Sequence, residues 1–319
     1  MPAQGIWAEK YRPKRLRDIA GQQHIITRLE AFVQSRTLPH CLFAGPAGCG
    51  KTTTALAIAH ELYGDAWKAN FLELNSSDER GIDTVRVKVK DFARTISLGN
   101  TFKIICLDEA DALTKDAQHA LRRTMEKYSS TARFILSCNY SSRIIPPIQS
   151  RCAVFRFTSL KEADVVACLR SIAGAEGIPV SESAYGAVLQ SAEGDMRKAI
   201  NLLQGAALRG AEVTEETVYA IASRPHPDAV RSMLAAAMNG AFRDARNMLV
   251  MLLHEQGLAG EDIIKEIHNQ IFELDIPDSQ KLALIEKAGE YEFRLTEGSN
   301  PRIQLEALLA QFGFVKHEK

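Results

Sequence analysis

The strongest chemical signal in the sequence is the octapeptide GPAGCGKT, residues 45–52. It matches the pattern G-x-x-x-x-G-K-[ST], and it stands directly after a strand-like apolar run and directly before the helical pattern TTALAIAHEL. In that context glycines let the backbone wrap around phosphates, and the following helix N-terminus adds positive potential. Lys51 would reach the β- and γ-phosphates, and Thr52 would hold Mg²⁺. The predicted binding residues for the nucleotide are Gly45, Pro46, Ala47, Gly48, Cys49, Gly50, Lys51 and Thr52.

A pair of carboxylates, Asp108 and Glu109, ends the apolar run in KIICLDEAD. One carboxylate at a strand end near phosphates can bind Mg²⁺ through water, and the next can orient or deprotonate an attacking water. The pair could instead mark an ordinary helix N-terminus, which favours acidic residues. Beside a phosphate loop we favour Asp108 as a metal ligand and Glu109 as a catalytic residue. Asp111 completes the motif DEAD, and we assign it no role in the chemistry.

The elements that must position these residues alternate between strand and helix. Five short apolar runs are typical of buried strands: CLFAG (41–45), FLELN (71–75), KIICLDEA (103–110), RFILSCN (133–139) and AVFRF (153–157). Helical patterns separate them. This repeated alternation predicts an α/β domain with a parallel sheet and crossover helices.

Only helical patterns follow residue 158. The first four cover residues 161–175, 181–192, 195–209 and 214–223. The segment SRPHPD (223–228) is typical of a linker, and about five further helices run to residue 314. Asn300 before Pro301 is a good N-cap and first-turn pair for the last helix. The sequence therefore predicts an α/β domain, a small helical domain and a second helical domain.

Composition narrows the class of protein. The 319 residues include 39 basic and 39 acidic side chains, so any nucleic-acid site must come from local charge patterning. Six cysteines form no CxxC pair, which predicts no zinc site and a reducing compartment. No apolar run approaches the roughly 18 residues of a membrane span, and the N-terminus has no signal core. We therefore expect a cytoplasmic protein with no membrane partner.

Seven ordered motifs together make the pattern specific. They are WAEKYRP (7–13), GPAGCGKT, NSSDERGID (75–83), LDEAD, SCN (137–139), SRC (150–152) and GDMRKAIN (194–201). With them the chain resembles the AAA+ ATPases and, among these, the small subunits of replication factor C, the sliding-clamp loader of archaea and eukaryotes. The resemblance covers nearly the whole chain. It implies an AAA+ P-loop parallel-sheet domain (1–159), a helical lid (160–224) and an all-α C-terminal collar domain (225–319).

The resemblance also implies roles around the nucleotide. Tyr11 and Pro13 would border the adenine of ATP, although they could simply belong to a packed N-terminal arm. Asn139 corresponds to a sensor that touches the γ-phosphate or the lytic water, although Asn is also a common turn residue. Arg197 corresponds to a second sensor near the γ-phosphate of its own ATP, and otherwise would be a solvated helix arginine. Asn75 corresponds to a switch that holds the catalytic glutamate away until DNA arrives.

The phosphate loop departs from the commonest form at two positions. Ala47 replaces a usual proline and Cys49 a usual threonine or valine. Because backbone N–H groups build the cradle, binding should survive. Cys49 is expected to make the site sensitive to thiol reagents.

Arg151 of SRC directly precedes the last predicted strand of the α/β domain, so it need not lie near its own phosphate loop. The alternative is a surface salt bridge, which is typically worth under about 1 kcal/mol. The resemblance implies an arginine finger acting in trans on the ATP of the next subunit, an effect of about 10³–10⁵ in rate.

The stretch DTVRVKVKDFARTI (83–96) fits both a strand and a helix period, and the longer helical stripe favours a helix. A basic stripe on such a helix is usually a solvated face. The resemblance places this helix along a central chamber, where Arg80, Arg86 and Lys90 would contact DNA phosphates. In the loop that follows, Ile96 and Leu98 would touch the clamp, or else pack in the core.

As a whole, the resemblance implies an ATPase that opens a sliding clamp and loads it onto primed double-stranded DNA. Clamp and DNA would stimulate its hydrolysis of ATP to ADP and phosphate. The partners would be the replication factor C large subunit and other small subunits in a hetero-oligomer, expected to be a pentamer, associated with the nucleoid in a prokaryote. Two alternatives stay open. One is another AAA+ remodeller, such as a helicase loader or Holliday-junction motor, and the other is a scaffold subunit that binds ATP without hydrolysing it.

Overall fold

The structure is a computed structural model that describes residues 5–77, 85–95 and 102–315. The chain divides into two compact units. The first contains residues up to 178 together with 192–204, and the second contains 179–191 together with 205 onward. The predicted boundaries at 159/160 and 224/225 stay a prediction.

A five-stranded parallel sheet forms the centre of the first unit, with the strand order β2-β3-β4-β1-β5. The strands are β1 (Cys41–Ala44), β2 (Phe71–Asn75), β3 (Lys103–Asp108), β4 (Ala132–Cys138) and β5 (Ala153–Arg156). Each coincides with a predicted apolar run. The inner strands are mostly apolar, and they are buried at nearly every position because both faces of the sheet are covered. The α/β prediction is confirmed.

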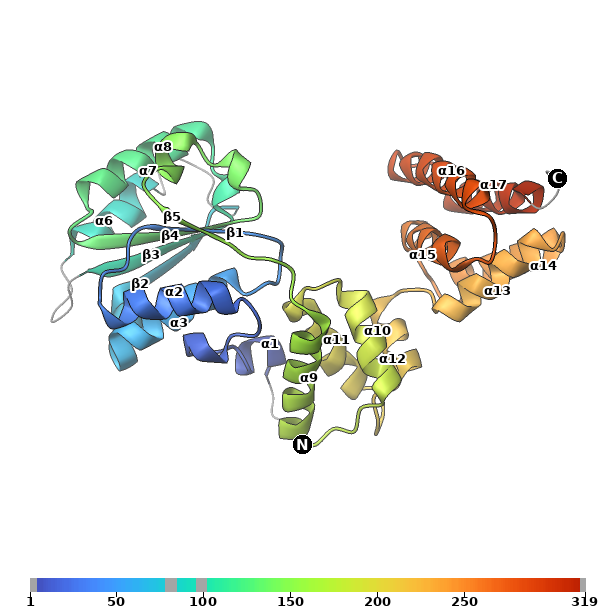
Figure 1. Ribbon diagram of the computed structural model, residues 1–319, viewed down its shortest axis with the longest axis horizontal. Helices are drawn as coiled ribbons and strands as arrows, with labels where there is room; N and C mark the ends of the chain where they lie inside the picture. Colours follow the sequence, from blue (N-terminus) through green and yellow to red (C-terminus); the bar gives the residue numbers. More distant parts are fainter. Residues whose placement is uncertain (1–4, 78–84, 96–101, 316–319) are drawn as a thin grey trace. The chain divides into compact units, whose positions relative to one another are not determined.

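Helices cover both faces of this sheet, as Figure 1 shows. On one face, α2 (Gln23–Gln34) and α3 (Lys51–Tyr63) enclose a core that includes Phe43, Ile58 and Phe155. On the other face lie α6 (Lys90–Arg94), α7 (Lys115–Lys127) and α8 (Pro146–Gln149), over a core with Ile105, Leu121 and Phe134. The remaining helices of this unit are α1 (Trp7–Lys10), α4 (Trp67–Asn70), α9 (Glu162–Glu176) and most of α11 (Met196–Ala207).

The described part of the second unit is built from helices, with one isolated parallel bridge between Val180 and Val213. Its elements are α10 (Glu182–Ala192), α12 (Glu215–Ala222), α13 (Pro227–Met238), α14 (Phe242–Val250), the π-helical turn η6 (Met251–Glu255), α15 (Gly260–Glu273), α16 (Asp278–Thr296) and α17 (Pro301–Val315). The six segments from α13 to α17, with η6 among them, share one core, to which Leu234, Ile267 and Phe312 belong. The linker is shorter than predicted, because Pro227 already starts α13. Asn300 Oδ1 accepts from Ile303 N, which confirms the predicted N-cap of α17.

The ambiguous basic stretch is helical over its described part. A π-helical turn, η3 (Val85–Val89), leads directly into α6. Val89 is fully buried, whereas Val87 is 57% exposed. A strand would have placed these two valines on one face, since its side chains repeat every two residues. The helical interpretation is therefore confirmed for residues 85–94.

Among the described helices, none has both the length and the apolar composition needed to cross a membrane.

The two valines offer a matched test of this helix. We expect Val89→Ala to lower the free energy of unfolding by about 2 kcal/mol, because it removes buried methyl groups from a packed core. Val87→Ala should change it by less than about 0.5 kcal/mol, since its side chain faces solvent. Urea unfolding followed by circular dichroism measures both. Equal losses for the two variants would contradict the helical packing.

Candidate nucleotide-binding site

A pocket in the first unit lies where the strands of the sheet end. Its walls come from the N-terminal arm, the phosphate loop, the ends of β3 and β4, and the starts of α3 and α11. Ligands of parallel α/β sheets bind beyond the carboxyl ends of the strands, so this is the expected location. The predicted residues that line it are Tyr11, Pro13, Ala47, Gly48, Cys49, Gly50, Lys51, Thr52, Asp108, Glu109, Asn139 and Arg197.

The phosphate loop is packed so closely that two of its glycines have no room for a side chain. A Cβ at Gly45 would lie 2.4 Å from the carbonyl oxygen of Phe157. A Cβ at Gly48, where φ is +66°, would lie 2.0 Å from Asp195 Oδ1. The loop is also bonded to the start of α11, since Met196 N donates to Gly48 O (3.2 Å). These glycines therefore serve the packing of the loop as well as the approach of phosphates.

Lys51 is buried at the centre of the loop, with only 8% of its surface exposed. Its Nζ donates to Gly45 O (2.7 Å), Pro46 O (2.6 Å) and Asn139 Oδ1 (3.1 Å). All three donors of the ammonium are thus used, and one reaches the end of β4. The loop after β1 and the predicted sensor after β4 are held together by this one cation.

The predicted magnesium ligands meet directly. Thr52 Oγ1 donates to Asp108 Oδ2 (2.7 Å), across from the first turn of α3 to the end of β3. Mg²⁺ prefers oxygen ligands, and it is commonly held by one or two protein groups together with substrate phosphates. Ser137 also lines this pocket and is 1% exposed, and its hydroxyl has no hydrogen-bond partner among the described residues. This donor set fits a hydrated Mg²⁺.

Glu109, next to the predicted metal ligand Asp108, has an unusual backbone geometry. Glu109 has φ +52°, a left-handed conformation that is uncommon outside glycine and clusters at functional sites. Its side chain is exposed and lines the pocket. Its own backbone N donates to Asp108 Oδ1 (3.0 Å). The strained turn therefore presents the Glu109 carboxylate to the pocket beside Asp108.

Sequence reasoning missed two residues at this edge of the sheet. Asp111 Oδ2 accepts from the backbone N–H groups of Asn139 (3.3 Å) and Tyr140 (3.2 Å). The other is Ser137, two residues before the sensor asparagine and so on the same face of β4. That period-two relation could have pointed to Ser137 from the sequence. Asp111 gives a weaker signal, because its contact joins residues 28 positions apart.

The N-terminal arm lines the pocket with Tyr11 and Pro13, and it is also packed. Tyr11 Oη donates to Glu176 Oε1 (2.7 Å), and Lys10 Nζ lies 2.6 Å from the same oxygen. These bonds lower the pKa of Glu176. Trp7 is buried, and its backbone N donates to Gln204 Oε1 (2.9 Å). The arm is therefore packed, and the contact of Tyr11 and Pro13 with adenine stays a prediction.

Arg197 enters the pocket from the first turn of α11. Asp195 caps this helix by accepting from Lys198 N (3.0 Å), which fixes the direction of the first turn. The Arg197 side chain itself is exposed. It is therefore free to meet an anion at the mouth of the pocket.

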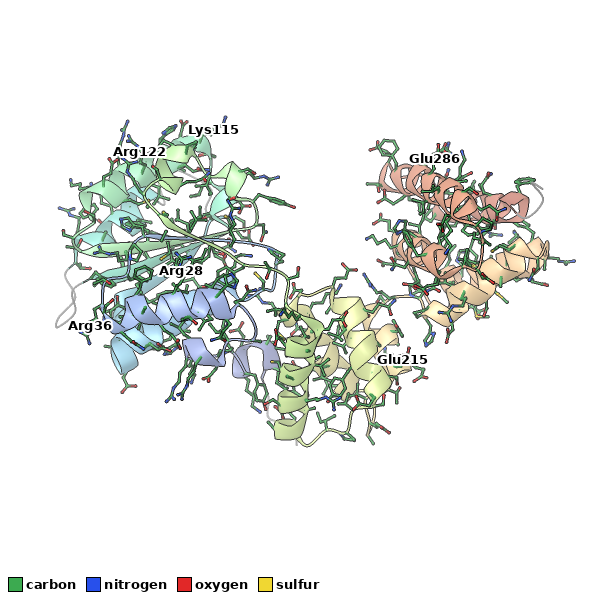
Figure 2. All side chains as sticks on the ribbon, viewed as in Figure 1. Arg28, Arg36, Lys115, Arg122, Glu215 and Glu286 are labelled. Atoms are coloured by element: carbon green, nitrogen blue, oxygen red, sulfur yellow. The ribbon has the colours of Figure 1, made fainter. Side chains whose placement is uncertain are left out.

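Arg151 is not among the residues that line the pocket. Its Nη2 lies 2.6 Å from Glu126 Oε1 on α7, and its Nη1 donates to Pro147 O (2.7 Å). Glu126 is also paired with Arg122 (3.3 Å), which projects from α7 on the side away from the sheet in Figure 2. The surface salt bridge that was the alternative interpretation is therefore present, and the arginine stands apart from its own phosphate loop.

Asn75 and Lys90 are not among the residues that line the pocket. Asn75 pairs with Asp108 in the register of β2 and β3, and its Oδ1 accepts from Ser77 N (2.9 Å) and Ser77 Oγ (2.8 Å). Lys90 is exposed on α6. Outside the described residues lie Arg80, Ile96, Leu98 and the side chain of Arg86.

Comparisons with known proteins agree with this geometry. Residues 41–160 match the family "ATPase family associated with various cellular activities (AAA)", and residues 225–311 match the replication factor C C-terminal domain. A replication factor C small subunit of Methanococcus maripaludis strain S2 is 54% identical over 311 residues, which cover 97% of this chain and 99% of the relative. One of Halobacterium salinarum is 54% identical over 307 residues, covering 96% and 95%.

The chain belongs to the replication factor C small subunit family. As a member of this AAA family it is an ATPase, and the matches do not favour the remodeller or scaffold alternatives. The Holliday junction branch migration motor RuvB of Thermotoga maritima superimposes with a TM-score of 0.55 at 18% identity, covering 78% of this chain and 86% of that one. At this identity the likeness shows a shared AAA+ fold alone.

The environment of Cys49 opposes the expected thiol sensitivity. The side chain is 1% exposed, and its Sγ donates to Pro46 O (3.0 Å). Burial raises the pKa of the thiol, which reduces the fraction of reactive thiolate.

Cys168 provides an internal control, because it lines the same pocket but is only partly buried. We expect N-ethylmaleimide to label Cys49 at least about 10-fold more slowly than Cys168, because the Cys49 side chain is almost fully buried whereas burial raises the pKa of both thiols. Mass spectrometry of proteolytic peptides over time measures both rates. Labelling of Cys49 as fast as that of Cys168 would contradict this account of the loop.

Proposed function

We propose that this chain acts as a small subunit of a clamp loader, in which bound ATP favours an assembly that opens a sliding clamp. Hydrolysis, triggered by primed double-stranded DNA, releases the closed clamp. The observation that carries the proposal is the half-complete site. The groups for binding ATP converge on one pocket, whereas Arg151 stands outside it. The complete catalytic site therefore requires a second subunit.

Within the pocket the roles follow from position. Tyr11 and Pro13 border the adenine, and Lys51 binds the β- and γ-phosphates. Glu109 orients or deprotonates the attacking water, Asn139 contacts the γ-phosphate or that water, and Arg197 meets the γ-phosphate from α11.

Mg²⁺ would be held by Thr52 and Asp108, and when bound it neutralises charge that develops on the phosphates. The direct bond between Thr52 and Asp108 supports this assignment, because it already places a hydroxyl and a carboxylate at one point of the pocket.

The proposed role of Arg151 is that of an arginine finger for the ATP of a neighbouring subunit. Its present partner Glu126 is exposed, and an exposed ion pair contributes under about 1 kcal/mol. A γ-phosphate with its larger negative charge would compete well for the guanidinium. The salt bridge and the finger are thus compatible, since the first costs little to break.

The partners would be the replication factor C large subunit and further small subunits, the sliding clamp, and primed DNA. Lys90, with Arg80 and Arg86, is proposed to contact DNA phosphates. Ile96 and Leu98 are proposed to contact the clamp, and Asn75 to restrain Glu109 until DNA binds. Such work implies an intracellular protein associated with the nucleoid in a prokaryote. Several subunits with a few basic residues each would give a neutral chain a salt-dependent DNA site.

The ATPase rate tests the proposed function directly. We expect clamp and primer-template DNA, added together to the assembled complex, to raise ATP turnover well above the rate with either alone. Release of inorganic phosphate measures it. A rate that the two together leave unchanged would overturn the clamp-loader proposal.

Arg151→Ala tests the proposed subunit interface. We expect ATP affinity within about 3-fold of wild type but turnover lowered by about 10³-fold or more, because the finger acts on the transition state of the neighbour. Arg17→Ala removes an exposed arginine of the same unit and serves as the control with normal turnover. Full activity of Arg151→Ala would rule out the finger.

A further inference from the structure

Asp111 lies in η4 (Ala110–Ala112), the single turn that follows Glu109. Its Oδ2 accepts from Asn139 N (3.3 Å) and Tyr140 N (3.2 Å). It does not line the pocket, so it has no direct access to a bound nucleotide there. Any effect of Asp111 on ATP hydrolysis must therefore act through the residues to which it is hydrogen-bonded.

Asp111 binds the backbone N–H groups of Asn139 and Tyr140. These two groups follow the end of β4 and have no partner among the described strands of the sheet. β4 ends at Cys138, whose carbonyl oxygen accepts from Gly45 N (3.2 Å) at the base of the phosphate loop. The next two residues turn away, and both are exposed. The Asp111 carboxylate accepts hydrogen bonds from both N–H groups. It therefore fixes the backbone just beyond the end of β4, where the hydrogen bonds of the sheet no longer hold it.

Asn139, whose backbone is fixed in this way, is one of the predicted site residues. Asn139 Oδ1 accepts from Lys51 Nζ (3.1 Å), so its direction is set from two sides. Lys51 holds the amide, and Asp111 holds the backbone that carries it. The same short segment joins Asp111 to Glu109, whose carbonyl oxygen accepts from Ala112 N (2.8 Å). Asp111 thereby links the turn that presents Glu109 with the loop that presents Asn139.

We infer that Asp111 is a positioning residue for ATP hydrolysis. It keeps the Asn139 side chain aligned with the γ-phosphate or the lytic water, and in a fixed position relative to Glu109. This rests on the role proposed for Asn139. Small misplacements matter in such a site, since an error of about 1 Å can lower a rate by about 100-fold. Nucleotide binding itself depends on the phosphate loop, which Asp111 does not touch.

A double-mutant cycle tests this on the full chain, in the assembly in which the wild type hydrolyses ATP. We expect Asp111→Ala and Asn139→Ala each to lower kcat by about 10-fold or more, with ADP affinity within about 2-fold of wild type. The double variant should be no slower than Asn139→Ala alone, because Asp111 acts only through that amide. Asp111→Asn, which keeps an acceptor oxygen, should recover most of the activity. Asp116→Ala removes an exposed carboxylate nearby and should leave kcat unchanged.

The outcomes separate the possible failures. If Asn139→Ala is slow and the two effects multiply in the double variant, Asp111 acts independently and the inference is wrong while the sensor role stands. If Asn139→Ala is fully active, the proposed role of Asn139 fails and the inference falls with it. Thermal unfolding of Asp111→Ala is compared with that of Asp111→Asn. If Asp111→Asn folds normally and is as slow as Asp111→Ala, a simple acceptor role is overturned.

Discussion

The hydrogen bonds of the Lys51 ammonium are the interaction on which the rest of the site depends. Its three hydrogen bonds tie the carbonyl oxygens of the phosphate loop to Asn139 at the end of the neighbouring strand. A buried cation without partners is costly, so the loop and the strand end must both keep their places to satisfy it. The parallel sheet supplies that arrangement, because β1 and β4 pair in register and end at the same edge. Thr52 and Asp108 repeat the link one strand further, from α3 to β3.

The chain shares its AAA+ fold with a branch migration motor at 18% identity. Fold alone therefore does not decide the task. The features proposed to distinguish a clamp-loader subunit lie outside the pocket, in Arg151 and in the helices matched to the replication factor C C-terminal domain. Binding is built within one chain, and hydrolysis is proposed to need two.

Much of this could be predicted from the sequence because the signals are local. The phosphate loop carries its chemistry in eight consecutive residues, and the five strands are continuous apolar runs. The helix over residues 85–94 was predicted from the helical period of its apolar residues. The buried Val89 and the exposed Val87 agree with that period. The bonds from Asp111 to Asn139 and from Arg151 to Glu126 could not be predicted, since they join residues 28 and 25 positions apart whose meeting depends on the order of the strands. The burial of Cys49 was missed for the same reason, because it depends on how the whole loop packs.

The affinity for ATP tests the central claim most directly. Isothermal titration calorimetry of the full chain with Mg²⁺–ATP should give a single site that Lys51→Ala weakens by about 10- to 100-fold, the loss expected for a charge-assisted hydrogen bond at a phosphate. The far-UV circular dichroism spectrum of the variant should match that of the wild type. Unchanged ATP affinity in a folded Lys51→Ala protein would contradict the assignment of this pocket.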